Sequence, residues 1–152
     1  MKDIVNSFKA EIPALSINEG YARMLCAVFV SQLDPTVEEL ADIKTAVSEA
    51  VTNCIVHAYK GQKDRSKKII YIQAQYNNKQ EVKITIKDKG CGIENISRAM
   101  QPLYTTDPQS ERTGMGFCIM ESFMDKLKVT SKVGAGTKIV MYKKIKNQEN
   151  VQ

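Results

Sequence analysis

Glu49 and Asn53 are the first candidates for chemistry, because they lie four residues apart in a segment with helical periodicity. At that spacing both side chains leave the same face of a helix, while the apolar stripe with Val47 and Val51 occupies another face. A carboxylate can act as a general base, and an amide oxygen can coordinate Mg²⁺. A solvated glutamate and a tolerated asparagine would have the same spacing, so the pair alone assigns no function.

A second candidate is the segment 88–93, which directly follows a predicted strand and has glycine at alternate positions, Gly90 and Gly92. Glycine lets the backbone approach a flat or charged ligand without a Cβ clash. Asp88, at the end of the strand, could accept a hydrogen bond from an exocyclic amine such as that of adenine. A tight turn with a capping aspartate would explain the same residues.

Two further glycine segments follow. Gly114 and Gly116 lie where a helix is predicted to begin, and exposed N–H groups at a helix start bind phosphate. This segment lacks the lysine of a Walker A loop, and it does not follow a strand as a dinucleotide-binding fingerprint would. Gly134, Gly136 and Thr137 form another close-approach turn, with a hydroxyl that could support a nucleotide base. A helix entry and a hairpin turn are the structural alternatives.

Apolar periodicity and turn residues predict the elements that position these groups. We predict strands over residues 4–12, 69–76, 81–87, 126–131 and 137–143. We predict helices over residues 19–32, 37–59 and 96–100, and from 115–117 to 124. Asn18 is expected to cap the first helix, and Thr36 with Glu39 to form a capping box on the second.

The first two predicted helices each have an apolar face. In the first helix the predicted buried positions are Tyr21, Leu25, Val28 and Phe29. In the second they are Leu40, Ile43, Val47, Ala50, Val51, Cys54 and Ile55. Together with an antiparallel hairpin over 69–87, these elements predict an α+β two-layer sandwich. Its sheet would be mixed but mostly antiparallel, with the helices on one face.

The length of 152 residues predicts one domain, which we place at residues 1–146, followed by a polar tail over 147–152. The net charge of +5 suits an anionic partner, whether a nucleotide, a nucleic acid or an acidic protein surface. The four cysteines are dispersed, and the one histidine, His57, cannot complete a zinc site with them, so we expect free thiols in a reducing cytoplasm. We see no signal peptide and no apolar run of about 20 residues, so we expect neither a secreted nor a membrane-spanning protein.

The order and spacing of the motifs resemble the Bergerat ATP-binding fold of gyrase-type ATPases, histidine kinases and anti-sigma kinases. Glu49 and Asn53 on a helix are followed by Asp-x-Gly-x-Gly, a Thr/Ser-rich loop, Gly-x-Gly and then Gly-x-Gly-Thr. Because the motifs take up nearly all of the 152 residues, we do not expect a phospho-acceptor helix pair or a transducer domain as well. A histidine kinase or a gyrase subunit is therefore not expected.

A closer resemblance covers nearly the whole chain. The segments 21–23, 31–36, 43–53, 101–106 and 111–121 are similar to those of the anti-sigma-F factor family of endospore-forming bacteria. In that family the protein holds sigma factor F inactive and, using ATP, phosphorylates a serine of an anti-anti-sigma protein. The sequence departs from the family mainly in the basic segment 60–68 and in the C-terminal tail, which carry no motif.

The resemblance implies a role for each matching residue. Glu49 would take the proton of the acceptor serine, and Asn53 would ligate Mg²⁺ between the phosphates of ATP or ADP. Asp88 and Thr137 would hold adenine. The other nucleotide-binding residues implied are Gly90, Gly92, Thr105, Thr106, Arg112, Gly114, Met115, Gly116 and Phe117.

The resemblance also implies the partners: sigma factor F, the anti-anti-sigma protein and a second copy of the chain, in the cytoplasm. No membrane contact and no direct nucleic-acid contact are expected. Arg23 and Glu111 would contact the partner proteins. Separately, the Pro, Thr and Ser content of residues 102–113 and their junction with the predicted phosphate-binding helix start predict that this segment forms a lid over ATP. We interpret His57 as a structural helix residue.

Three other functions stay open at this point. One is a nucleotide-gated binding module that transfers no phosphate, and another is the related stress-response anti-sigma kinase. The third is a nucleic-acid binder, suggested by the net charge of +5. Its support is poor, because tryptophan is absent and no stripe of basic and aromatic residues is visible along the chain.

Overall fold

The computed structural model describes residues 1–102 and 115–146 of the chain. Its strands form one sheet in the order β1-β2-β3-β5-β4. They are β1 (Ile4–Pro13), β2 (Ile69–Asn77), β3 (Glu81–Lys87), β4 (Lys126–Lys132) and β5 (Gly136–Lys144). Every neighbouring pair of these described strands is antiparallel, so the sheet is simpler than the mixed sheet that we predicted.

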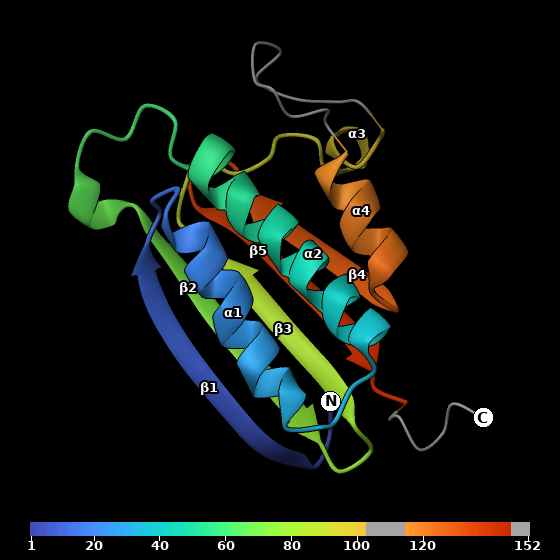
Figure 1. Ribbon diagram of the computed structural model, residues 1–152. Helices are drawn as coiled ribbons and strands as arrows, with labels where there is room; N and C mark the ends of the chain where they lie inside the picture. The colour runs from blue at the N-terminus through green and yellow to red at the C-terminus, as the bar shows by residue number, and fades with distance from the viewer. Residues whose placement is uncertain (103–114, 147–152) are drawn as a thin grey trace.

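Three helices lie against one face of the sheet and give the protein two layers (Figure 1). They are α1 (Asn18–Ser31), α2 (Val37–Asn53) and α4 (Gly116–Phe123). A short helix, α3 (Ile96–Ala99), lies near the start of α4. The predicted α+β two-layer sandwich is confirmed. In the described part of the chain, no helix has both the length and the apolar character that crossing a bilayer requires.

The core lies between the helices and the sheet. Alternate strand residues are buried, as the two-residue period of a strand requires, and in β3 these are Val82, Ile84 and Ile86. Helix α2 supplies much of the opposite side. Its fully buried residues are Ile43, Ala46, Val47, Ala50 and Val51.

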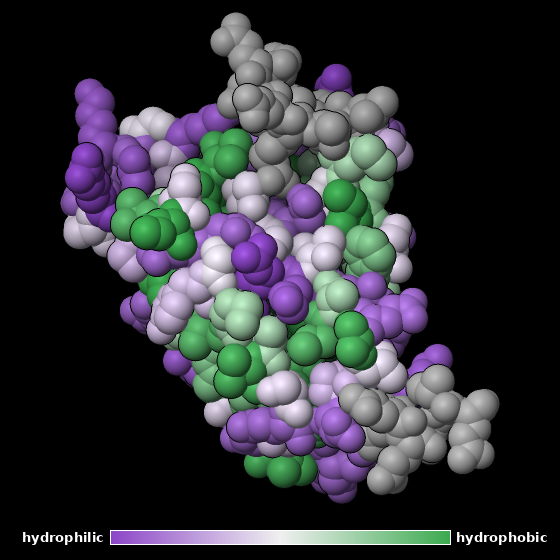
Figure 2. Space-filling model, viewed as in Figure 1, coloured by the Kyte–Doolittle hydropathy of each residue, from purple (hydrophilic) through white to green (hydrophobic). Residues whose placement is uncertain are grey.

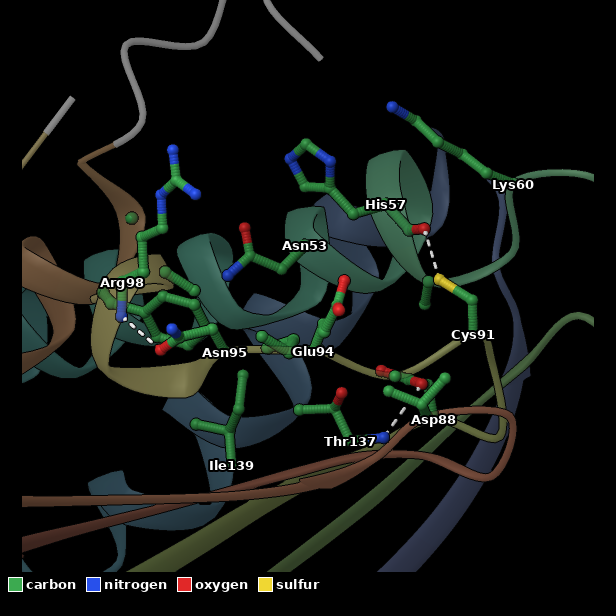
Figure 3. Close-up of a pocket in the computed structure, with 17 residues that line it drawn as sticks. Asn53, His57, Lys60, Asp88, Cys91, Glu94, Asn95, Arg98, Thr137 and Ile139 are labelled. Atoms are coloured by element: carbon green, nitrogen blue, oxygen red, sulfur yellow. Dashed lines mark hydrogen bonds between the residues drawn. The ribbon is translucent and has the colours of Figure 1, made fainter. Parts of the chain in front are cut away.

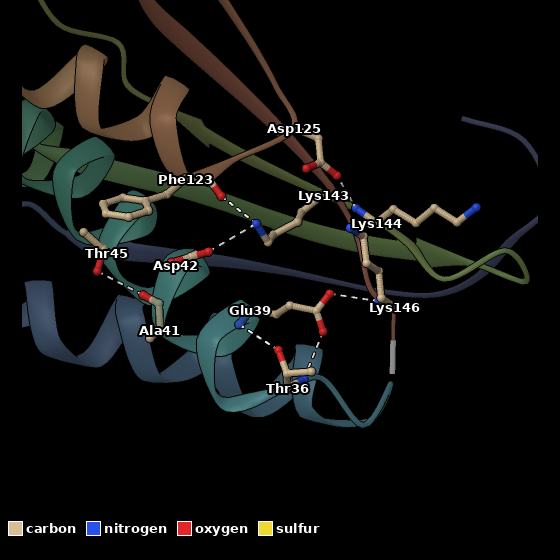
Figure 4. Close-up of polar contacts among 10 residues, drawn as sticks. All are labelled: Thr36, Glu39, Ala41, Asp42, Thr45, Phe123, Asp125, Lys143, Lys144 and Lys146. Atoms are coloured by element: carbon tan, nitrogen blue, oxygen red, sulfur yellow. Dashed lines mark hydrogen bonds and ion pairs between the residues drawn. The ribbon is translucent and has the colours of Figure 1, made fainter. Parts of the chain in front are cut away.

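Both ends of α2 carry local features that position neighbouring segments. At its start, the Thr36 hydroxyl accepts from the Glu39 N–H at 3.1 Å and Glu39 accepts from the Thr36 N–H at 2.9 Å, so the predicted capping box is confirmed (Figure 4). The second carboxylate oxygen of Glu39 accepts from the Lys146 N–H at 2.8 Å. At its other end, the helix continues as one π-helical turn, Cys54–Ala58. Such wide turns occur often at functional sites.

Two predictions for α1 are wrong. Asn18 does not cap the helix: its side chain donates to the Pro13 carbonyl at 2.9 Å, and the N-cap residue is Ile17. Tyr21 and Val28, predicted to be buried, are 55% and 63% exposed. The buried face is instead formed by the small residues Ala22, Cys26 and Ala27 together with Phe29 and Val30. Small side chains let α1 pack closely against its neighbours, and apolar periodicity alone did not reveal that preference.

Gly90 lies where the segment after β3 passes the end of the π-helical turn. The Cys91 N–H donates to the Ala58 carbonyl at 2.7 Å, which draws the two backbones together. A Cβ on residue 90 would lie 2.0 Å from that carbonyl oxygen. Only glycine therefore permits this approach.

Replacing Gly90 with alanine should lower the free energy of unfolding by about 1–3 kcal/mol, the usual cost of overpacking. Urea denaturation measures this change. Gly20→Ala is the matched control, because its new Cβ would meet no atom closer than the Arg23 guanidinium at 3.6 Å. Alanine in this helix should raise stability by about 0.5–1 kcal/mol. A Gly90→Ala variant as stable as wild type would refute the close approach to Ala58.

Candidate functional site

A cavity of about 750 Å³ opens between the end of α2 and the sheet (Figure 3). Asn53 and His57 border it from the helix side, Asp88 and Thr137 from the sheet side, and Arg98 from α3. This volume is in the range of small-molecule and cofactor sites. Residues far apart in the sequence thus converge on one ligand-sized space.

Asp88 is fixed by backbone hydrogen bonds at the floor of this cavity and is only 5% exposed. Its Oδ1 accepts from the Gly90 N–H at 2.9 Å and from the Thr137 N–H at 3.2 Å. Its own N–H donates to the Thr137 carbonyl at 2.9 Å. The carboxylate therefore joins the end of β3 to the start of β5.

The second carboxylate oxygen of Asp88 faces a different neighbour, the Cys54 thiol, with Sγ at 3.7 Å. Burial raises the pKa of Cys54 well above its usual range, and the Asp88 charge adds to the effect, so the thiol stays protonated and can act only as a weak donor. Burial also raises the pKa of Asp88, although the N–H groups of Gly90 and Thr137 work against that rise. A ligand amine would satisfy this second oxygen better than the thiol does.

Ser131 connects the segment after Asp88 to the β4–β5 hairpin. Its hydroxyl accepts from the Ile93 N–H at 2.7 Å and lies 2.8 Å from the Thr137 hydroxyl and 3.0 Å from the Gly136 carbonyl. Gly136 has a φ of +120°, and a Cβ there would lie 2.2 Å from the Asp88 carbonyl oxygen. These contacts fix the position of the Thr137 hydroxyl at the cavity wall.

Helix α4 begins at the cavity with Gly116 and Phe117, which both border it. The N-cap residue, Met115, makes no side-chain cap. The N–H groups of the first turn therefore lack that partner and suit an anionic ligand group. The phosphate site that the glycine pattern predicts would lie at this helix start and stays a prediction.

The structure brings together many, but not all, of the predicted site residues. The predicted residues that border the cavity are Asn53, Asp88, Gly92, Gly116, Phe117 and Thr137. Gly90 does not border it; it packs on Ala58. Glu49 and Met115 do not border it either, and Glu49 lies half-buried one turn before Asn53 on α2. The predicted residues Thr105, Thr106, Glu111, Arg112 and Gly114, and residues 103–113 of the predicted lid, lie outside the described residues.

Sequence reasoning missed several residues that border the cavity. His57, interpreted as a structural residue, lies on the cavity one turn beyond Asn53, and the four-residue spacing could have revealed it. Arg98 follows Asn95, which caps α3 by accepting from the Arg98 N–H at 3.0 Å. An asparagine that caps a short helix can be recognised in the sequence, so Asn95 could have pointed to Arg98 three residues later. With Lys60, these residues give the cavity basic side chains suited to phosphate groups.

Comparisons with known proteins place this geometry in a family. The model of the histidine kinase-like ATPase domain matches residues 12–143. An anti-sigma F factor from Clostridium perfringens is 53% identical over 140 residues, which cover 92% of this chain and 97% of that protein. One from Priestia megaterium is 46% identical over 144 residues, covering 95% and 96%.

Solved structures share the fold at low sequence identity. The RsbU and RsbW domains of a Mycobacterium tuberculosis protein align with a TM-score of 0.65 at 14% identity, over 93% of this chain and 33% of that one. The SiaB–SiaC complex from Pseudomonas aeruginosa aligns with a TM-score of 0.60 at 8% identity, over 93% and 91%. With the family model and the close relatives, these similarities lead to one conclusion: the chain belongs to the anti-sigma F factor family and has the histidine kinase-like ATPase fold.

Proposed function

We propose that this chain binds ATP in the cavity, phosphorylates a serine of an anti-anti-sigma partner and holds sigma factor F inactive. The observation that carries the proposal is the buried Asp88, with one oxygen held by backbone N–H groups and the other turned to a weak thiol donor. Adenine offers an exocyclic amine that this oxygen can accept from. The family relationship supports the same assignment.

The remaining cavity residues suit the rest of a nucleotide. Thr137 lies beside Asp88 and offers a hydroxyl to the base. The start of α4 at Gly116 suits phosphate oxygens, and Arg98 and Lys60 add positive charge near them. In this arrangement the base would lie at the sheet and the phosphates between the ends of α2 and α4.

The donor set also fits Mg²⁺ bound through the nucleotide. Among the described residues no group of three or more His, Cys, Asp or Glu side chains could hold a metal ion by itself. Mg²⁺ commonly takes one or two protein ligands plus phosphate oxygens and water, and Asn53 would be the protein ligand here. When bound, the ion would neutralise charge that develops on the phosphates.

Glu49 would act as the general base, one helical turn before Asn53. The partner's serine oxygen forms a bond to the γ-phosphorus while the bond from that phosphorus to the β–γ bridging oxygen breaks. The serine proton passes to the Glu49 carboxylate, and ADP leaves with the bonding electrons. A protein that only binds its partners would not need this carboxylate.

Glu49→Gln should keep ATP affinity and lose phosphotransfer by about 10²- to 10⁴-fold, because the amide cannot accept the proton. Incubation with γ-labelled ATP and the anti-anti-sigma protein measures the transfer. Glu38→Gln is the matched control on the exposed first turn of α2 and should transfer at the wild-type rate. An undiminished rate in Glu49→Gln would remove Glu49 from the base role.

Helix α1 offers the surface for the partner proteins. Exposed apolar residues recur along one side of it and form apolar surface over the helix (Figure 2). They are Ile17, Tyr21, Met24 and Val28. Arg23 lies beside them and is paired with Glu19 at 3.2 Å. Apolar patches of this kind mark protein interaction sites, and arginine is frequent at binding hot spots.

One shared surface would let the anti-anti-sigma protein displace sigma factor F, because both cannot occupy α1 together. From the family resemblance we also propose that the chain acts in the cytoplasm and as a homodimer. By the same resemblance, Glu111 would also contact the partner proteins.

Arg23→Glu should weaken binding to both partners by about thirtyfold or more, the effect of losing a hot-spot arginine. ATP affinity should not change, since Arg23 does not border the cavity. The half-exposed Arg23–Glu19 pair contributes little to stability, so the variant should fold. Titrations with each partner and with ATP measure these effects.

Arg65→Glu is the matched charge reversal, at an exposed position in the short turn Arg65–Lys67. It should bind both partners as wild type does. If Arg23→Glu behaved like Arg65→Glu, the competition for α1 would be disproved.

A further inference from the structure

The helices cover one face of the sheet (Figure 1), and the opposite face carries many lysines. Alternation along each strand and the pairing register place eight of them on that face. They are Lys9, Lys83, Lys87, Lys126, Lys128, Lys132, Lys138 and Lys144. All are exposed except Lys83, which is half-buried. We call this surface the lysine face.

Two tyrosines lie among these lysines. Tyr142 of β5 pairs with Lys83 on one side and with Lys126 on the other. The ammonium groups of these lysines lie 6.0 and 5.5 Å from the centre of its ring. Tyr71 of β2 pairs with Lys87, and Lys89 lies 4.8 Å from the centre of its ring. The two aromatic rings thus have cations beside them on this sheet face.

The positive charge of the lysine face is not neutralised within the described part of the chain, where none of the eight lysines forms an ion pair. Lys87 lies directly opposite Lys138 in the register, and like charges at such positions destabilise a sheet. By the same register, the acidic residues on this face are Glu11 and Glu81. A polyanion would relieve this repulsion.

We propose that the lysine face binds single-stranded nucleic acid. Lysines would contact phosphates, and bases would stack on Tyr71 and Tyr142, which is the combination that proteins use for single strands. A lipid surface fits less well, because the one aliphatic residue in the middle of the face, Val140, is only 5% exposed and cannot insert. The sequence evidence against a nucleic-acid binder was the absence of tryptophan and of a basic and aromatic stripe along the chain. The stripe runs across strands, where the linear sequence does not reveal it.

The experiment uses the full chain and a fluorescein-labelled oligothymidylate of about 16 nucleotides, the upper site size for single-strand binding folds. Fluorescence polarisation over a salt series gives Kd and its salt dependence. At physiological salt we expect a Kd of about 10⁻⁴ to 10⁻⁶ M, and each phosphate neutralised should contribute about −0.7 to the slope of log K against log salt.

Two sets of variants separate charge from stacking. Lys87→Gln with Lys138→Gln should make the salt slope shallower by about 1.4. Tyr142→Ala should weaken binding by about tenfold with the slope unchanged, and Tyr142→Phe should restore it. Lys44→Gln with Lys63→Gln, on α2 and in the connector after it, is the matched control and should bind as wild type does. An ATP titration and thermal unfolding confirm that each variant is folded.

Several results would overturn the proposal. One is the absence of any polarisation change at about 100 μM protein in low salt. Another is equal binding by the Lys87→Gln/Lys138→Gln variant and the Lys44→Gln/Lys63→Gln control. The face would be a nonspecific cationic surface if Tyr142→Ala bound the oligonucleotide as tightly as wild type does, and if polyglutamate or phosphatidylserine vesicles bound as tightly as the oligonucleotide. Because the lysine face lies away from the cavity, failure here leaves the nucleotide-binding proposal intact.

Discussion

The Asp88 carboxylate joins the segments that form the cavity, through Oδ1 bonds to the Gly90 and Thr137 N–H groups. Each such bond to a charged group contributes about 1.5–3 kcal/mol, yet burial still raises the pKa of Asp88. The folded chain therefore holds a proton on Asp88 more readily than the unfolded chain does. It follows that the free energy of unfolding falls as the pH rises through the folded-state pKa. The protein retains a buried acid that costs stability when ionised, which is understandable if a ligand needs its second oxygen.

Much of this architecture follows from local signals in the sequence. The Thr36–Glu39 capping box, the hairpin of β2 and β3, the end of β3 before Asp88 and the start of β5 at Gly136 depend on neighbouring residues, so pattern reasoning could find them. The buried face of α1 depends on which side chains are small enough for close packing. Amphipathic periodicity alone favoured Tyr21 instead. The lysine face depends on how distant strands pair, and no single stretch of sequence contains that information.

The two-layer arrangement separates the proposed activities in space. The cavity lies at one end of the helical layer, between α2 and the sheet, and α1 presents its apolar residues on the outer side of the same layer. The reverse face of the sheet carries the lysines. The proposed sites for a nucleotide, for protein partners and for a polyanion thus lie on separate surfaces. The π-helical turn Cys54–Ala58 adds to the cavity, because it carries His57 towards the ligand space and packs Ala58 against Gly90.

The role of Asp88 as the adenine acceptor is tested most directly by titrating ATP into Asp88→Asn while following thermal unfolding. The amide oxygen of the substituted side chain can still accept from the Gly90 and Thr137 N–H groups. Its NH₂ group would face the adenine amine, and two donors cannot form a hydrogen bond with each other. ATP affinity should fall by about tenfold or more, and the melting temperature should be no lower than that of wild type. Wild-type ATP affinity in the folded variant would contradict the assignment of this cavity as an adenine site.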